Sequence, residues 1–321
     1  MNRNMGGFKM EKRFAIVVDG ACDLTEEQCR ERDILFVPSH VSLPDGRDVI
    51  WKNKWDVMSK EAFYDALKKD PASFTTAPAN AEEFGEVLEP LVKEGRDILC
   101  FSISSSISGT FSFINQAINE LQDKHGQVNI RPVDSLRFSI AEGMLALRAA
   151  DLRDQGMTME ETYEEVEKVK NTLHQAGWLD DLSFVAKKGR LSHSKAFFGS
   201  MVGIKPIGEF DYNGLTTVIG KAKGQKRAFT ALVAYIEKTG IDLQNQDIFI
   251  AQTNRMPQAE AYRDLLQDHF HPRSIRIVDV FPACGVNIGP GLMAAYYYGT
   301  PISKGLEKER AILNETLEKD N

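Results

Sequence analysis

The chain has 321 residues, of which 42% are apolar and 26% charged, and this composition argues against disordered, collagen-like and coiled-coil proteins. Its length exceeds what one hydrophobic core usually serves, so two domains are expected. With 39 basic and 46 acidic side chains the net charge is −7. This charge disfavours nucleic acid as a partner, because phosphate contacts require clustered lysine and arginine.

Several features predict a cytoplasmic protein. The four cysteines, Cys22, Cys29, Cys100 and Cys284, show neither CxxC spacing nor a disulfide framework, as is typical of a reducing compartment. The basic N-terminus is not followed by an apolar segment of signal-peptide length. The longest uncharged run, residues 280–303, is interrupted by prolines and glycines, so no stable membrane insertion is expected.

The first half of the chain alternates between short apolar runs and amphipathic segments. The apolar runs predict buried strands at residues 14–19, 34–37, 97–103 and 128–133. The amphipathic segments predict helices at 59–68, 80–92, 110–121, 138–153 and 158–173. Thr75 and Thr76 fall in a predicted loop. This alternation is typical of an α/β domain with a mostly parallel sheet, whose ligands bind at the carboxyl ends of the strands.

The pattern changes from Trp178 onward. Strands are predicted at 179–185, 204–210, 216–219, 248–252 and 275–280, and helices at 225–238, 258–269 and 304–318. The segment Asp211–Gly214 is a hairpin turn between two of these strands. We therefore expect an N-terminal α/β domain over residues 1–174 and a C-terminal α+β domain with a mixed or antiparallel sheet over 175–321.

A turn rich in hydroxyl groups, residues 104–110, links a predicted strand to a predicted helix. Its sequence is Ser-Ser-Ser-Ile-Ser-Gly-Thr. Hydroxyl and backbone N–H groups at a helix N-terminus favour an anion such as a carboxylate or a phosphate. Two simpler interpretations stay open, because Ser108 is a common capping residue and the loop hydroxyls of Thr75 and Thr76 often bond to nearby backbone.

Two further segments are candidates for contacts with a ligand or partner. Residues 282–291 are rich in small side chains, so their backbone can approach another group closely, and Asn287 can donate and accept hydrogen bonds. A structural turn is the alternative for this segment. A basic cluster suits an acidic partner surface, or is simply solvated, and consists of Lys187, Lys188, Arg190, Lys221, Lys223, Lys226 and Arg227.

No motif predicts a cofactor or a metal. The histidines lack HExxH spacing, and the chain has neither a P-loop nor a GxGxxG turn after a strand. Asp19, Asp23 and Asp134 leave open an alternative function, a metal-dependent enzyme acting on a small acidic or phosphorylated metabolite. A regulatory or scaffold module with an unused pocket is a third possibility.

The order of four segments resembles the DegV family of bacterial lipid-binding proteins along nearly the whole chain. The segments are Val-Val-Asp-Gly-Ala-Cys-Asp-Leu at 17–24, Thr-Thr-Ala-Pro-Ala at 75–79, Ile-Ser-Ser-Ser-Ile-Ser-Gly-Thr at 103–110 and Gly-Val-Asn-Ile-Gly-Pro-Gly at 285–291. Each is unremarkable alone, and the combination is specific.

The resemblance implies a two-domain protein that holds one long-chain fatty acid between its domains. It places the fatty acid carboxyl at Thr75 and Ser108, with Asn287 nearby, and implies that a separate fatty acid kinase phosphorylates the bound carboxyl to an acyl phosphate. The binding protein itself would then not be an enzyme. Apolar residues near the motifs are candidates for an acyl tunnel, namely Phe111, Phe113, Phe197, Phe198, Met201 and Ile204.

The chain departs from the family pattern at three places. Gly20 follows Asp19 where the family commonly has serine, and Asn287 stands where it commonly has histidine. The loop at 75–78 is Thr-Thr-Ala-Pro where the family often has Thr-Ser-Gln-Pro, so the glutamine side chain is missing. Asparagine can hydrogen-bond a carboxylate but cannot hold a proton or a positive charge. Any acid–base contribution at that position is therefore not expected here.

Overall fold

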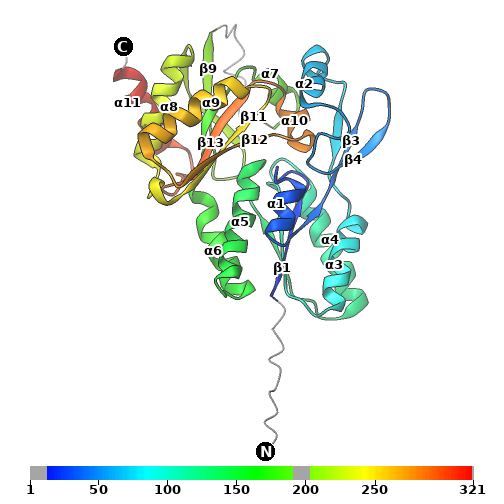
Figure 1. The fold of residues 1–321 in the computed structure, drawn as a ribbon. Helices are drawn as coiled ribbons and strands as arrows, with labels where there is room; N and C mark the ends of the chain where they lie inside the picture. The colour runs from blue at the N-terminus through cyan, green and yellow to red at the C-terminus, as the bar shows by residue number, and fades with distance from the viewer. Residues whose placement is uncertain (1–12, 191–202, 320–321) are drawn as a thin grey trace, which may run out of the picture.

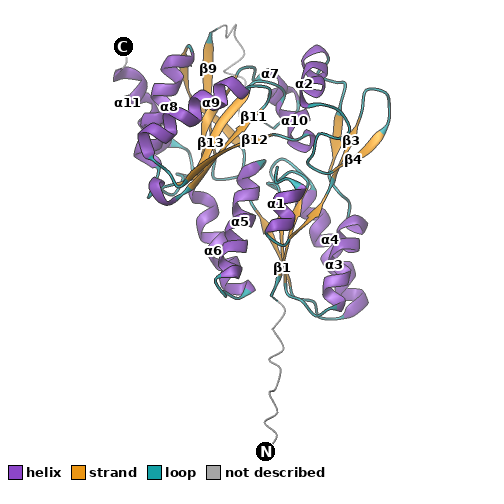
Figure 2. Ribbon diagram, viewed as in Figure 1, coloured by secondary structure: helices purple, strands orange, loops and turns teal. Residues whose placement is uncertain are grey.

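The computed structural model describes residues 13–190 and 203–319. Within these residues the strands form three sheets, with the orders β2-β1-β6-β7, β10-β9-β8-β13-β11-β12 and β4-β3-β5. Figures 1 and 2 show the first sheet with its helices below the second sheet, and the third sheet beside both.

The first sheet is parallel throughout and is buried on both faces. Its strands are β1 (Ala15–Asp19), β2 (Ile34–Val37), β6 (Ile98–Ser102) and β7 (Ile130–Asp134). In β1, Ile16 and Val18 face one apolar core, and Ala15 and Val17 face another. This burial on both sides explains why the strands have continuous apolar runs.

Helices cover both faces of this sheet. One face carries α3 (Ala81–Lys93) and α4 (Thr110–His125), which pack on each other. The other carries α5 (Ile140–Asp154) and α6 (Met159–Val169), and α1 (Glu26–Glu31) packs against β2. Asn80 and Glu83 form the predicted capping box at the start of α3.

The second sheet is mixed. Its strands are β8 (Leu173–Leu179), β9 (Ile204–Phe210), β10 (Thr216–Lys223), β11 (Asp247–Gln252), β12 (Ser274–Asp279) and β13 (Leu292–Tyr298). Only the β11–β12 pair in this sheet is parallel. The second sheet packs against α8 (Gln225–Thr239), α9 (Met256–Phe270) and α11 (Glu307–Lys319). The predicted combination of a parallel α/β part and a mixed-sheet part is confirmed.

The third sheet is small and antiparallel. It consists of β3 (Ser39–Ser42), β4 (Asp48–Trp51) and β5 (Thr75–Ala77), and α2 (Lys60–Lys69) packs with it around a cluster of aromatic rings. Two short helices from later in the chain, α7 (Ser183–Lys187) and α10 (Pro282–Ile288), contact each other, and α10 also contacts β3 and β5. Tyr64 Oη donates to the Val280 carbonyl over 2.6 Å. The small sheet therefore links the beginning of the chain to residues near its end.

The structure differs from the sequence prediction at specific elements. The strand predicted at 179–185 is wrong, because β8 ends at Leu179 and α7 begins at Ser183. Thr75 lies in β5 and not in a loop. Neither α10 nor β13 was predicted, and the division placed after residue 174 falls inside β8.

Candidate functional site

A cavity of about 520 Å³ lies where the three sheets meet. Its volume is in the range of small-molecule sites, about 300 to 1,000 Å³. The wall is supplied by β5, the hydroxyl-rich turn, α7, α10 and one face of the second sheet. Most of this wall is apolar and includes Ile107, Phe138, Leu179, Leu182, Val218 and Leu292.

Polar groups line the cavity where the hydroxyl-rich turn meets α4. Ser108 Oγ and Thr110 Oγ1 lie 2.8 Å apart, and the Thr110 amide donates to Ser108 Oγ over 3.3 Å. The N-cap residue of α4 is Gly109, and the helix has no side-chain cap. Ser108 is therefore not an ordinary N-cap, and Gly109 and Thr110 bring the N-terminus of α4, whose dipole favours an anion, to the cavity wall.

The structure brings Thr76, and not Thr75, to the cavity. The two residues are neighbours in β5, and successive side chains of a strand point to opposite faces. Thr75 is exposed and is not among the described residues that line the cavity, whereas Thr76 is half-buried and lines it. Of the two threonines in β5, Thr76 is therefore the one that lines the cavity, whereas the sequence motif points to Thr75.

Asn287 lies beside Thr76 in the cavity wall. Asn287 Nδ2 donates to Thr76 Oγ1 over 3.1 Å and makes a longer contact of 3.4 Å with the Ala283 carbonyl. Thr76, Ser108 and Asn287, from three separate elements, thus line one cavity with hydroxyl and amide groups. Of the three residues expected from sequence, Ser108 and Asn287 lie there.

Packing around α10 explains the small residues of segment 282–291. A Cβ atom on Gly285 would lie 2.7 Å from Tyr64 Oη, and one on Gly289 would lie 2.5 Å from the ring of Phe184. Gly289 also has a φ of 76°, which other residues rarely adopt. These glycines allow α10 to seat against α2 and α7, which places Asn287 in the cavity wall.

The three aspartates considered as metal ligands hold loops together instead. Asp19 accepts hydrogen bonds from the amides of Ala21 at 2.7 Å and Ile103 at 2.8 Å. Asp134 accepts from the Ser105 amide at 3.1 Å and from its hydroxyl at 2.5 Å. No group of three His, Cys, Asp or Glu side chains among the described residues is arranged to hold a metal ion.

Asp23 connects the end of β1 to α10 and α5. It accepts a hydrogen bond from the Ser139 hydroxyl and one from the Phe281 amide at 2.8 Å, and Phe281 is the N-cap of α10. Burial raises the pKa of Asp23 to about 8 and that of Asp19 to about 6. Both acids position loops that form the cavity.

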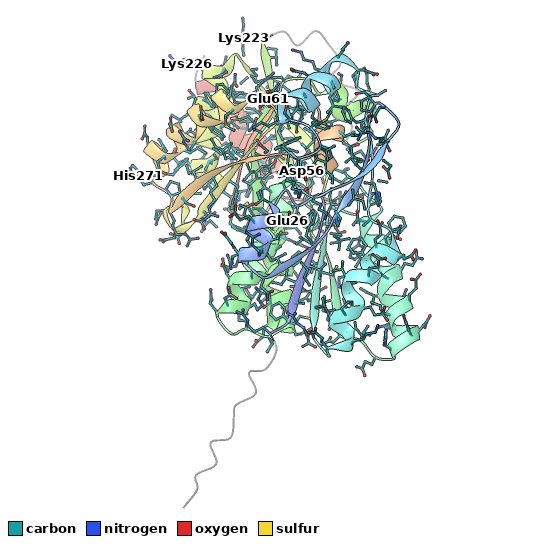
Figure 3. The ribbon with its side chains drawn as sticks, turned by 45° about the vertical axis from the view of Figure 1, so that its right-hand side comes forward. Glu26, Asp56, Glu61, Lys223, Lys226 and His271 are labelled. Atoms are coloured by element: carbon teal, nitrogen blue, oxygen red, sulfur yellow. The ribbon has the colours of Figure 1, made fainter. Side chains whose placement is uncertain are left out.

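The basic cluster contributes one residue to the cavity wall. Arg190 is exposed, lines the cavity, and donates from Nε to the Ile107 carbonyl over 3.4 Å. Lys223 and Lys226 point outward at the junction of β10 and α8, among the surface charges labelled in Figure 3.

The apolar residues expected to form a tunnel do not line the cavity where they can be placed. Phe111, Phe113 and Ile204 are not among its described lining residues, and Phe113 packs into the core between α3 and α4. Phe197, Phe198 and Met201 lie outside the described residues.

The wall is instead formed by alternate positions of β8, β9 and β10. In β8 these positions are Gln175, Gly177 and Leu179, and Trp178, between the last two, lines the cavity as well. The alternation of these positions could have predicted a strand from the sequence. The polar residues His174 and Gln175 interrupt the apolar pattern, so the strand was not predicted.

Gly20 is required by its contact with Ser39. A Cβ atom at position 20 would lie 2.5 Å from Ser39 Oγ and 2.6 Å from the Ser39 amide nitrogen. Ser39 is buried and lines the cavity. The Ser39 hydroxyl thus occupies the space beside Gly20 that a serine side chain would need.

Comparisons with known proteins agree on one family. The sequence model of the DegV family, described as uncharacterised, matches residues 13–300. A DegV domain-containing protein of Clostridium perfringens is 29% identical over 288 residues, which cover 90% of this chain and 98% of the relative.

Solved structures share this fold. A DegV family protein from Thermus thermophilus, described by its fatty acid binding, has a TM-score of 0.80 and 22% identity, with 90% of this chain and 100% of that chain covered. The Streptococcus pneumoniae Fatty Acid Kinase (Fak) B3 protein, loaded with linoleic acid, has a TM-score of 0.75 and 19% identity, with the same coverage. Over the described residues, we find no helix with the length and apolar character that crossing a membrane demands.

Proposed function

The chain belongs to the DegV family, and on that basis we propose that it binds one long-chain fatty acid in the cavity between its sheets. The observation that carries this proposal is the composition of the cavity wall. The hydroxyl and amide groups of Thr76, Ser108 and Asn287 form the polar part of the wall, and apolar side chains form most of the rest. An amphiphile with an acidic head and an apolar chain matches both parts.

The carboxylate is assigned to Thr76, Ser108 and Asn287. Each can donate a hydrogen bond to a carboxylate oxygen, and the N-terminus of α4 adds a favourable dipole. A hydrogen bond to a charged group contributes about 1.5 to 3 kcal/mol. The side-chain amide of Asn287 donates hydrogen bonds but does not titrate, so this position can orient the head group and adds no acid–base chemistry.

The acyl chain supplies most of the affinity. Burying about fourteen methylene groups at roughly 0.8 kcal/mol each gives a gross gain on the order of 11 kcal/mol. This gain exceeds what the head group provides, so tail burial sets the strength of binding and the polar groups set its direction.

In the proposed reaction the protein presents the fatty acid carboxyl to a separate kinase and is not itself the catalyst. An oxygen of the carboxylate attacks the γ-phosphorus of ATP on the kinase, which yields an acyl phosphate and ADP. The similarity to the Fak B3 protein supports this role. Because the reaction consumes ATP, the proposed location is the cytoplasm.

The alternative of a metal-dependent enzyme has less support. Asp19, Asp23 and Asp134 accept hydrogen bonds from backbone amides and serine hydroxyls, and they do not converge on one point. Turnover of a small phosphorylated metabolite that depends on added Mg²⁺ would favour this alternative.

The direct test is extraction of the purified protein followed by mass spectrometry of the released lipid. We expect one long-chain fatty acid per protein molecule. Protein that releases no lipid, and that after delipidation does not bind stearic or oleic acid, would contradict the proposal. A hydroxamate assay with a bacterial fatty acid kinase and ATP then tests acyl phosphate formation on the loaded protein.

A further inference from the structure

One buried amide in the cavity wall has an unused hydrogen-bond donor. Gln175 lies in β8, is only 4% exposed and lines the cavity. Its Oε1 accepts a hydrogen bond from Tyr296 Oη over 3.3 Å. Among the described residues we find no acceptor for Gln175 Nε2, and this N–H₂ group borders the open space beside Gly208 in the cavity wall.

The surroundings of this amide are apolar or equally unpartnered. The neighbouring wall positions on the same sheet face are Gly177, Gly208 and Val218. A Cβ atom on Gly208 would lie 3.4 Å from Gln175 Nε2 and 3.0 Å from Thr216 Cγ2. The absence of a side chain at 208 therefore opens the space in front of the amide.

Thr216 lines the cavity beside Gly208, which its methyl carbon Cγ2 adjoins. Its Oγ1 is buried and has no hydrogen-bond partner among the described residues. Of these two polar groups on the floor formed by β8, β9 and β10, Gln175 Nε2 is the one that adjoins Gly208.

These groups are separate from the proposed carboxyl site. Thr76, Ser108 and Asn287 come from β5, the hydroxyl-rich turn and α10, and among the described residues none of them hydrogen-bonds Gln175. A buried donor without an acceptor is unfavourable, and a ligand that supplies the acceptor removes that penalty. Methylene groups supply none, and a carbon–carbon double bond is only a weak acceptor.

We propose that the cavity is adapted to fatty acids that carry an oxygen atom on the acyl chain, as a hydroxyl or a keto group, and that this oxygen accepts a hydrogen bond from Gln175 Nε2. The inference rests on the proposed function and narrows its ligand class. A site built to hydrogen-bond an oxygen discriminates against the analogue that lacks it, because the buried donor is then left unpaired.

The test compares the affinities of delipidated protein for stearic acid and for a set of monohydroxystearic and ketostearic acids that differ in the position of the oxygen. Displacement of a fluorescent fatty acid measures each affinity. The variants are Tyr296→Phe and the double variant Tyr296→Phe with Gln175→Met. The first keeps the amide and serves as the matched control, and the second removes the amide without leaving the tyrosine hydroxyl unpaired.

We expect an oxygenated acid with its oxygen at one or two neighbouring positions to bind up to about tenfold more tightly than stearic acid, in the wild type and in Tyr296→Phe. In the double variant this ratio should fall by about tenfold, while binding of stearic acid is retained or improves.

Three results would overturn the inference. One is an equal ratio in the wild type and the double variant, and another is a Gln175-dependent preference for oleic acid over every oxygenated acid. The third is that the double variant alone no longer binds any of the acids, which would assign Gln175 to the binding of the carboxyl group. If the wild type binds neither stearic nor oxygenated acids, the proposed function itself fails.

Discussion

Thr75 and Thr76 illustrate what a sequence motif leaves undetermined at the level of one residue. The motif identifies the pair, but only the pairing of β5 with β3 decides which hydroxyl faces the cavity. Ser108 and Asn287 were found from sequence because their helices orient them through local signals, a turn rich in hydroxyls and a run of small residues. Gln175 was not found, since its significance depends on neighbours in β9 and β10.

Substitutions at these threonines test the assignment. Ser108→Ala combined with Thr76→Val should weaken fatty acid binding by about 1.5 to 3 kcal/mol for each hydrogen bond lost. Thr75→Val is the matched control, because it changes the same type of residue one position away on the exposed face. Equal losses in the Thr75 and Thr76 single variants, measured by titration calorimetry, would contradict the assignment.

The buried contact between Asp23 and α10 makes the free energy of unfolding depend on pH. Burial is the main cause of the raised pKa of Asp23, and the nearby charges of Asp279 and Asp19 add to it. The buried Glu142 also lies in this group, and burial raises its pKa as well. Between about pH 4 and 8 the folded state then binds more protons than the unfolded chain, so the free energy of unfolding falls as pH rises.

Asp23→Asn should reduce this pH dependence. Asparagine keeps an acceptor for the Phe281 amide, offers a donor to Ser139, and tolerates the left-handed backbone at position 23, where φ is 52°. Urea unfolding between pH 5 and 8 should show a decline in stability for the wild type and a shallower decline for the variant. Identical slopes would show that Asp23 does not titrate in this window.

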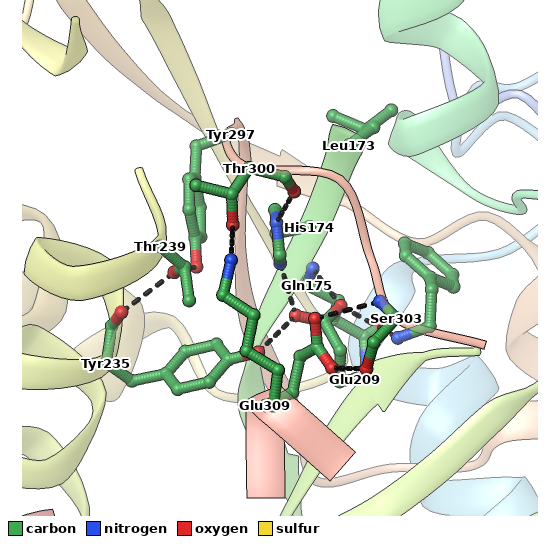
Figure 4. A network of polar contacts seen from close by, with 12 residues as sticks. Leu173, His174, Gln175, Glu209, Tyr235, Thr239, Tyr297, Thr300, Ser303 and Glu309 are labelled. Carbon is green, nitrogen blue, oxygen red and sulfur yellow. Dashed lines mark hydrogen bonds and ion pairs between the residues drawn. The ribbon is translucent and has the colours of Figure 1, made fainter. Parts of the chain in front are cut away.

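A buried polar network fixes the register between β8 and β9 (Figure 4). His174 Nδ1 lies 2.8 Å from Glu209 Oε2, and His174 Nε2 lies 2.7 Å from the Thr300 carbonyl oxygen. Both neighbours are hydrogen-bond acceptors, so the ring of His174 is held at both of its nitrogens. Glu209 also accepts hydrogen bonds from the backbone N–H of Gln175 at 2.7 Å, the backbone N–H of Phe210 at 2.8 Å and Tyr235 Oη at 2.8 Å.

Glu209→Gln should destabilise the fold by about 3 to 5 kcal/mol, because it breaks a fully buried pair and places an N–H₂ group or an unpaired contact where Glu209 Oε2 meets His174 and Tyr235. The control is Glu160→Gln, which breaks a pair with Arg131 whose side chains are 49% and 48% exposed. That change should cost below about 1 kcal/mol. Denaturant titration compares the two variants, and equal losses would mean that the pair is not ionised.

The elements that sequence predicted best are those with strong local patterns. β1, β6, α3 and α8 have continuous apolar runs, capping boxes or helical periodicity. β13 was missed because it follows two glycines and a proline, and β8 because His174 and Gln175 interrupt its apolar pattern. Both strands form because they pair with segments that are distant in the sequence, and a local pattern does not show this pairing.

At the scale of the whole molecule, the cavity wall is shared by the parts of the chain before and after β8. Further contacts join the same parts. Arg137 Nε donates to the Leu173 carbonyl over 3.0 Å, and Ser106 Oγ donates to the Asn213 carbonyl over 2.5 Å. A ligand in this cavity would contact the second and third sheets and the loops that follow β1 and β6, so its binding free energy would stabilise their arrangement together.

Fatty acid loading should therefore raise the melting temperature in one transition. At a free ligand concentration 100 times Kd, the added stability is about 2.7 kcal/mol. Scanning calorimetry of delipidated and loaded protein measures this change in melting temperature. In the double variant with Ser108→Ala and Thr76→Val, the melting temperature should rise less at the same ligand concentration. Two separate transitions, of which only one moves, would show that the halves respond independently.

The position of β13 has a consequence for biosynthesis. This strand is inserted between β8 and β11, although it is the last of the described strands in chain order. On the ribosome the second sheet therefore waits as two unjoined pieces until the codons for residues 292–298 have been translated. The cavity wall, which includes Leu292, is incomplete before that moment, and the unpaired strand edges are prone to aggregation until β13 is in place.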